Sequence, residues 1–285
     1  MRKITATLLA LVLLPMAGCG ERSLTEAELR AMLEAEVTQE ILAFEYGDYD
    51  GDGVFEAFAF VGAEEGGPPE GVCGALWFIN AKGAQELEVS QTGYWGLINV
   101  YAFGENKFAV MNQYATTGGY VSVWGVHKGK PRRENISGVG GGMRQMNDTS
   151  FTLWHSTYDF DVTDGVSTGH TWKNYWFYWD GKAFHEYGGV KITEVQLRKC
   201  GGAADILDAI QAKGEGIGEI YYRGNGIINV NHSRVYDSSR GNSYTILQLS
   251  DAKLTAVEVE DNSGFYLPAL APGIATYPEL PEIFN

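Results

Sequence analysis

Residues 171–187 read TWKNYWFYWDGKAFHEY, and this stretch decides the fold class. Aromatic side chains fill a run as long as a β-strand. Asp180-Gly181-Lys182 follows as a tight turn, and a second apolar run comes after it. Aromatic residues interrupted by Gly and Asp turns are typical of antiparallel hairpins. The stretch therefore predicts a hairpin whose first strand is Thr171–Trp179.

The same arrangement recurs along the chain. Each copy has a strand, a gap and then a hairpin closed by a Gly, Asp or Lys turn, and the copies begin at Phe55, Lys107, Ser150 and Gly226. Their spacing, roughly 50 residues, is close to that of propeller blades. Any antiparallel meander also produces such units. The pattern therefore predicts a mainly β fold, either propeller-like, an open meander or a sandwich.

Helices are expected at two places. Leu24–Phe44 has apolar residues at helical spacing, and Thr25 with Glu28 matches a capping box. Residues 193–214 form a short helical insertion that Thr193 caps. Four prolines make residues 267–285 an extended strap. We thus expect a first segment over 19–46 that includes the first helix, a β-rich domain over 47–266 and a C-terminal strap.

The N-terminus resembles a bacterial lipoprotein signal peptide over residues 1–18. Arg2 and Lys3 precede an apolar run that is too short to cross a bilayer, and Met16-Ala17-Gly18-Cys19 is similar to a lipobox. The resemblance implies cleavage before Cys19 and acylation of its thiol, with chains such as palmitate. Two acyl chains give a stable membrane anchor. An ordinary signal peptide with a coincidental cysteine is the alternative.

This resemblance places the domain on the extracytoplasmic side of a bacterial membrane, at either a Gram-positive cell surface or a Gram-negative outer membrane. The chain has a formal net charge of −15. Nucleic acid and anionic lipid both require basic surfaces, so this acidity argues against them as partners. Cys73 and Cys200 could pair outside the cytoplasm, or remain separate buried thiols.

The most explicit chemistry lies in residues 48–56, which read DYDGDGVFE. Carboxylates alternate at Asp48, Asp50 and Asp52, and Glu56 follows at the ninth position. Calcium prefers six to eight oxygen ligands, and the backbone carbonyl of Val54 would supply another. The carboxylates would repel one another without a cation. The alternative is a solvated acidic turn.

This loop resembles the DxDxDG calcium motifs of EF-hands, dockerins and the FG-GAP repeats of integrin-like propellers. It departs from the EF-hand because position twelve is Ala59 and the following residues have the pattern of a strand. A loop followed by a strand is more similar to the FG-GAP type. The resemblance implies a structural calcium ion bound by Asp48, Asp50, Asp52, Val54 and Glu56.

No catalytic constellation is visible. The five histidines form no zinc-binding spacing, and the sequence contains no GxSxG nucleophile motif. Trp172, Trp176 and Trp179 could stack on a sugar if one face of their strand is exposed, although burial of both faces is the favoured interpretation. We therefore expect a binding or structural module for a glycan or an envelope protein. The alternative is an enzyme or binding protein that acts on cell-wall or extracellular polysaccharide.

Overall fold

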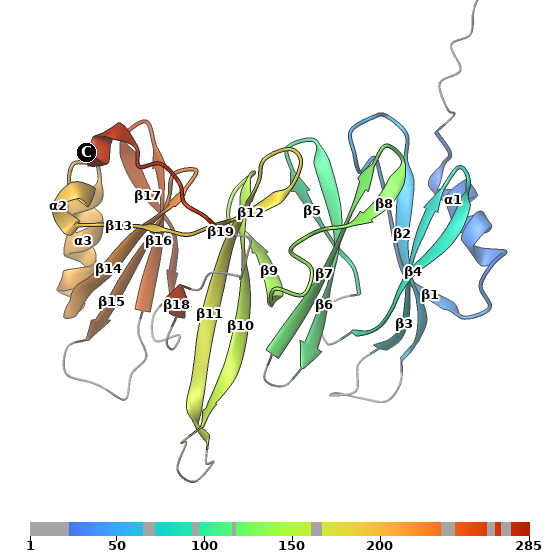
Figure 1. The fold of residues 1–285 in the computed structure, drawn as a ribbon, viewed down its shortest axis with the longest axis horizontal. Coiled ribbons are helices and arrows are strands. Elements are labelled where there is room, and N and C mark those ends of the chain that lie inside the picture. Colours follow the sequence, from blue (N-terminus) through green and yellow to red (C-terminus); the bar gives the residue numbers. More distant parts are fainter. Residues whose placement is uncertain are drawn as a thin grey trace, which may run out of the picture.

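A computed structural model describes residues 23–64, 72–92, 97–115, 118–160, 167–234, 243–260, 266–268 and 275–285. Within these residues the chain is mainly β, as the hairpin pattern predicts. Four sheets follow one another along the sequence and stand in a row, with helices at the two ends of the row (Figure 1). Each sheet is an antiparallel meander of consecutive strands, and the third also gains two parallel strands from the C-terminal tail.

The expected repeats correspond to these four sheets. The first sheet contains β1 Glu40–Gly47, β2 Glu56–Glu64, β3 Val72–Asn80 and β4 Gly83–Thr92. The second contains β5 Asn99–Phe103, β6 Asn106–Ala115, β7 Gly118–His127 and β8 Lys130–Arg133. The third contains β9 Gly141–Gln145, β10 Ser150–Phe160, β11 Ser167–Trp179 and β12 Phe184–Tyr187, joined by β18 Tyr266–Pro268 and β19 Ala275–Thr276. The fourth contains β13 Val190–Ile192, β14 Glu215–Gly224, β15 Ile227–Arg234, β16 Ser243–Ser250 and β17 Lys253–Glu260.

The inner strands are apolar on both faces, and this is what makes the sheets stack. In β2, Phe58 faces the second sheet, whereas the next residue, Ala59, faces the first helix. In β15, Ile227 faces the third sheet and Ile228 faces the helices at the other end. Successive side chains of a strand point to opposite faces, so each sheet needs an apolar neighbour on both sides. Full burial of one such large side chain contributes roughly 1.5–3 kcal/mol.

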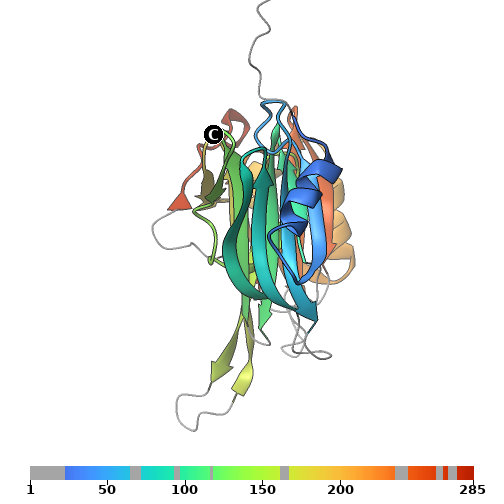
Figure 2. The same cartoon turned by 90° about the vertical axis from the view of Figure 1, so that its right-hand side faces the viewer.

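The row is open, and helices cover its two end faces. Helix α1 Glu26–Glu34 buries Leu29 and Leu33 against the first sheet (Figure 2). Helices α2 Glu194–Leu197 and α3 Ala203–Ala212 cover the outer face of the fourth sheet. The first and fourth sheets are therefore not packed on each other as they would be in a closed propeller. Of the arrangements that the sequence allows, the structure adopts the open one.

The first helix is shorter than predicted. The sequence pattern extends it over Leu24–Phe44, but the helix ends at Glu34, and Glu40–Gly47 is strand β1. The capping box of Thr25 and Glu28 is present as predicted. The prediction failed beyond Glu34 because β1, which contains Ile41, Phe44 and Tyr46, pairs with β2, so tertiary pairing outweighs helical periodicity. The β-rich part therefore begins at residue 40 rather than 47.

The helical insertion agrees with the prediction, and the described part of the strap contains two short strands and a short helix. Thr193 forms a capping box with Gln196, and α2 and α3 lie within residues 193–214. In the tail, β18 pairs with β11 and β19 pairs with β12. The short helix η1 Glu282–Phe284 then returns to the fourth sheet and buries Phe284. The strap thus connects the third sheet to the fourth.

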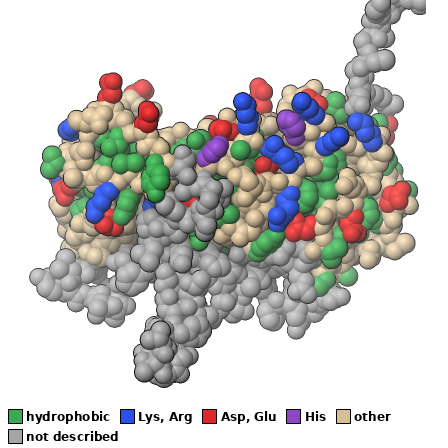
Figure 3. Space-filling model, viewed as in Figure 1, with side chains coloured by type: hydrophobic (Ala, Val, Ile, Leu, Met, Phe, Trp, Pro, Cys, Tyr) green, Lys and Arg blue, Asp and Glu red, His purple; other side chains and the backbone are tan. Residues whose placement is uncertain are grey.

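Cys73 and Cys200 are free thiols, in β3 and just after α2, so the possible disulfide between them does not form. Among the described residues, no helix has the length and apolar character needed to cross a bilayer. The described surface on the side shown in Figure 3 carries charged side chains of both signs.

The C-terminal anchor gives a first prediction. Phe284 packs against Tyr222, and its backbone oxygen accepts a hydrogen bond of 2.7 Å from the side chain of Gln196. Replacing Phe284 with Ala should lower the free energy of unfolding by about 3–5 kcal/mol, because it leaves a cavity under the fourth sheet. Urea denaturation measures this loss. The exposed Glu279→Ala is the control, and equal stability of the two variants would contradict the anchoring role.

Candidate metal centre

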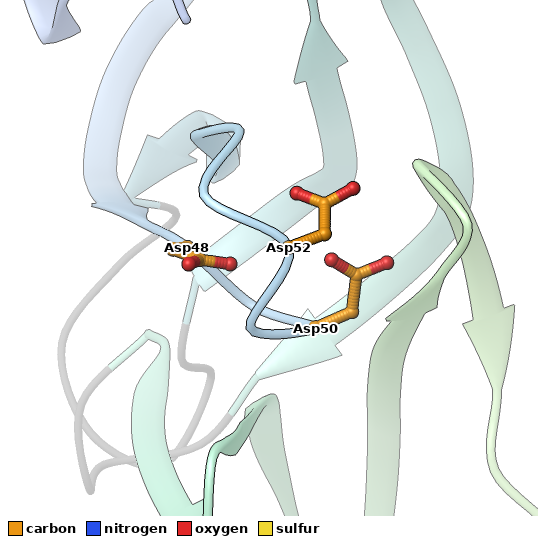
Figure 4. Close-up of side chains that lie close together, drawn as sticks. All are labelled: Asp48, Asp50 and Asp52. Atoms are coloured by element: carbon orange, nitrogen blue, oxygen red, sulfur yellow. The ribbon is translucent and has the colours of Figure 1, made fainter. Parts of the chain in front are cut away.

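The predicted calcium loop connects β1 to β2. One carboxylate oxygen from each of Asp48, Asp50 and Asp52 lies within 4.8 Å of the other two. Figure 4 shows the carboxylates of Asp50 and Asp52 side by side, with Asp48 on the other side of the loop backbone. The structure therefore brings together the three alternating aspartates, as the sequence predicts.

Backbone hydrogen bonds fix the shape of this loop. Asp48 accepts bonds from the N–H groups of Gly51 at 2.8 Å and Gly53 at 3.0 Å. Asp52 accepts one from the N–H of Val54 at 2.7 Å. Gly51 and Gly53 have φ angles of +75° and +85°, which glycine adopts without the steric penalty of a side chain. The glycines thus allow the tight path that turns alternate side chains toward one region.

Glu56, the first residue of β2, is the most unusual member of the group. Its side chain is 0% exposed, and neither carboxylate oxygen has a hydrogen-bond partner. Burial and the negative charges of Asp50 and Asp52 raise its pKa to about 8. The nearby backbone N–H of Tyr49 lowers the pKa in part, although it does not meet the geometric criteria of a hydrogen bond to Glu56. A buried carboxylate without partners is costly and needs either a proton or a cation.

Glu56 faces the same space as the loop. A cavity of about 260 Å³ is lined by Asp52, Val54 and Glu56, together with the turns that follow β3 and β7. Glu56 lies outside the 4.8 Å group of the three aspartates. Direct binding of one ion by all four carboxylates therefore requires a small closure of the loop, or a bridging water as at the ninth position of EF-hands.

A further carboxylate comes from the second sheet. Glu105, in the turn between β5 and β6, places Oε2 3.7 Å from the position that a Cβ on Gly51 would occupy. Glu105 could not be predicted from the sequence, because it follows the loop by some fifty residues and reaches it only through packing of the first two sheets. It adds negative charge beside the loop.

Direct ion pairs do not neutralise these carboxylates. Among the described residues, no Lys or Arg lies within 4.0 Å of the carboxylates of Asp48, Asp50, Asp52 or Glu56. Asp50 accepts a hydrogen bond from the N–H of Gly129 at 3.3 Å, while its other oxygen is buried without a partner. The donor set consists of oxygen atoms, which suit a hard divalent cation such as Ca²⁺ or Mg²⁺.

The predicted stacking tryptophans are used mainly in packing. Trp176 is 3% exposed and lies between the third and fourth sheets, with the guanidinium of Arg223 5.7 Å from its ring centroid. Trp179 is half-buried against Phe108 and Phe184. The side chain of Trp172 lies outside the described part of the structure, as does Cys19. At Trp176 the strand is buried, as the favoured interpretation expects.

One polar cluster was not predicted. His232 contacts the carboxylate of Glu215 through Nδ1 and the hydroxyl of Thr245 through Nε2, the latter at 3.0 Å. The residue types resemble a catalytic triad, but Thr245 is 1% exposed and cannot meet a substrate. His232 is therefore a core histidine with satisfied ring nitrogens, which is the general expectation for a buried histidine.

No family model matches this sequence, and no curated protein matches it significantly. The lipoprotein and calcium-loop resemblances therefore rest on the residues that carry them. The chemistry of the site is therefore the guide to function, because a fold alone does not define an activity.

The pKa of Glu56 generates a prediction for the metal-free protein. The folded state retains a proton on Glu56 up to about pH 8, whereas an unfolded Glu loses it near its ordinary pKa of 4.5. The folded state thus binds more protons in this window, so stability should fall as the pH rises from about 4.5 to 8. Glu56→Gln should remove this part of the fall. Urea midpoints between pH 5 and pH 8 measure it.

The exposed Glu36→Gln is the matched control and should keep the wild-type pH dependence. Other groups contribute to the slope in all three proteins, so the difference between the variants isolates Glu56. Parallel curves for wild type and Glu56→Gln would contradict the raised pKa.

Proposed function

We propose that this chain is an exported bacterial lipoprotein, held at a membrane by acyl groups on Cys19, whose β-rich domain is stabilised by a calcium ion in the loop of residues 48–56. The domain acts as a binding or structural module. The observation that carries the calcium proposal is the buried, partnerless carboxylate of Glu56 beside three converging aspartates. A divalent cation would offset the negative charge of Glu56 and of the three aspartates.

The position of the loop supports a structural role for the ion. The N–H of Phe55 donates to the hydroxyl of Ser23 at 3.0 Å, and the hydroxyl of Tyr46 donates to the backbone oxygen of Leu24 at 2.9 Å. The two residues that precede the cap of α1 are therefore tied to both ends of the loop region. A cation in the loop would stabilise the junction between the proposed anchor and the first sheet.

The loop lies between two strands of one sheet, and this also favours a structural ion. Calcium sensors open a pair of helices around their loops, whereas residues 40–47 and 56–64 are paired antiparallel. Binding can therefore rigidify the loop but has no helix pair to open. We assign Asp48, Asp50 and Asp52 as direct ligands, with Val54 and Glu56 completing the oxygen set.

Calcium should stabilise the folded protein. Extracellular calcium modules bind with dissociation constants of about 10⁻⁴–10⁻³ M. At calcium concentrations 10 to 100 times the dissociation constant, the expected gain is about 1.4–2.7 kcal/mol. Thermal melts with calcium and with chelator measure it. Asp50→Asn should lose most of the gain, because the variant retains the shape of the side chain but not its charge.

Asp148→Asn, an exposed change in the turn before β10, is the matched control and should keep the full calcium shift. Magnesium should give a smaller shift, since it holds its water more tightly and requires a stricter geometry. Wild-type melts that coincide in calcium and chelator would refute the metal proposal.

The anchor is tested separately in a bacterial host. The wild-type protein should sediment with membranes and incorporate labelled palmitate, because two acyl chains anchor a protein stably. Cys19→Ser should be released to the aqueous fraction without label. Cys73→Ser alters a thiol within β3 and should behave like wild type. A Cys19→Ser protein that stays labelled and membrane-bound would exclude Cys19 as the acylation site.

A further inference from the structure

A second cavity, of about 430 Å³, also borders the calcium loop, and Asp52 and Lys128 line both cavities. Its walls come from three consecutive sheets. The loop contributes Asp50 and Asp52, the start of β6 contributes Lys107, the turn after β7 contributes Lys128, and the turn after β11 contributes Lys182. Two lysines of the second sheet and one of the third thus line the same cavity. Its volume is in the range of small-molecule sites.

These lysines lack carboxylate partners. Within the described part of the chain, no acidic side chain lies within 4.0 Å of the ammonium groups of Lys107, Lys128 or Lys182. This is notable in a chain with 36 acidic and 21 basic residues, where partners are abundant. Figure 3 shows basic side chains along the upper edge of the row, with acidic side chains among them. Like charges that converge on one cavity favour an anion between them.

Arg132 and Glu134 hold part of this wall in place. The guanidinium of Arg132 donates two hydrogen bonds to Glu134, at 3.0 and 3.1 Å. It also donates to the backbone oxygen of Lys182 at 3.1 Å, which ties the third sheet to the second. The turn that carries Lys182 is therefore fixed relative to the turn that carries Lys128. The packing of the second and third sheets therefore determines the shape of this part of the cavity.

Lys128 has a backbone conformation that asparagine or glycine adopts more easily than lysine does. Lys128 and Gly129 have φ angles of +54° and +67° in the turn between β7 and β8. The turn between β14 and β15 has a similar backbone and uses Asn225 and Gly226, the preferred pair. A lysine in this left-handed conformation has a steric cost that glycine avoids and that asparagine tolerates more readily. The conformation of the turn alone would therefore favour asparagine over lysine at position 128.

An aromatic wall completes the cavity. Trp179 and Phe108 line it, and the indole N–H of Trp179 donates to Asn106 at 3.2 Å. A ring beside cationic groups suits a ligand that has both an acidic group and a flat or apolar face, such as an acidic sugar. Of Trp176 and Trp179, the predicted stacking residues whose side chains the structure describes, Trp179 is the one that lies in a cavity beside charged groups.

The loop and the lysines are electrostatically linked. Without a metal, the carboxylates of Asp50 and Asp52 face the same cavity as the lysines and offset their charge. A calcium ion bound to those carboxylates would leave the lysine charges uncompensated. Calcium and an anion should therefore each strengthen binding of the other, because coupling between two sites is reciprocal.

We propose that this cavity binds a small ligand bearing an oxyanion group, held by Lys107, Lys128 and Lys182, and that calcium in the adjacent loop tightens this binding. The proposal rests on the proposed calcium site for the coupling, but not for the pocket. A carboxylated sugar and a sulfate or phosphate group share the required chemistry.

Isothermal titration calorimetry with sodium sulfate, galacturonate and neutral galactose tests the proposal, in calcium and in chelator. At least one of the two anions should bind in calcium, and its dissociation constant should rise about fivefold or more in chelator, a typical strength of coupling. Galactose should not bind. Galacturonate binding without sulfate binding would identify an acidic sugar as the source of the oxyanion, and the reverse would identify a sulfate- or phosphate-type group.

The variant that isolates the pocket is Lys107→Gln combined with Lys182→Gln, because both lysines line this cavity and neither lines the smaller cavity beside Glu56, whereas Lys128 lines both. It should lose anion binding while keeping the calcium shift in thermal melts, since neither lysine belongs to the metal ligands. Lys253→Gln, an exposed change on β17 of the fourth sheet, is the control and should bind like wild type.

The outcomes separate the two proposals. No anion binding by wild type, or binding that the double variant retains, would overturn the pocket even if the calcium shift is present. Equal affinity in calcium and chelator would overturn the coupling. If calcium has no effect on melting but the lysine variant still abolishes anion binding, the calcium site fails and the pocket stands.

Discussion

Burial of both faces of each sheet is the constraint on which this structure depends. A sheet with apolar residues at successive positions cannot leave either face in water, so each sheet requires a packed layer on both sides. The second and third sheets satisfy this requirement with neighbouring sheets, and the end sheets satisfy it with helices. Stability is therefore shared along the row between nearest neighbours, as in repeat proteins that need capping units at their ends.

The charged edge of the row follows from the same stacking. Meanders of similar length place their turns side by side, and each turn carries polar residues because it must remain in contact with water. The loop of Asp48–Asp52, the turn at Lys128 and the turn at Lys182 belong to three different sheets, yet they line one cavity. The chemistry of this edge is thus a product of how the layers pack. No single hairpin contains it.

The parts that could be predicted are local in sequence. The strand and turn units, the insertion capped by Thr193 and the alternating aspartates all depend on residues a few positions apart. The parts that could not be predicted depend on contacts between separate strands or between layers. Glu105 reaches the loop from the next sheet, His232 meets Glu215 on the adjacent strand of the same sheet, and the lysines converge through the packing of the sheets. The end of α1 at Glu34 was missed for the same reason, since the pairing of β1 with β2 determines it.

The C-terminal strap has a consequence for the order of assembly. The first three sheets are formed largely from segments that follow one another, so they can close as the chain emerges from N-terminus to C-terminus. The strands β18 and β19 and the residue Phe284 come last, and they join the third sheet to the fourth. This joint can form only after the strap has been synthesised. A chain that crosses a membrane from its N-terminus would therefore connect these two sheets through the strap only after the strap has passed through.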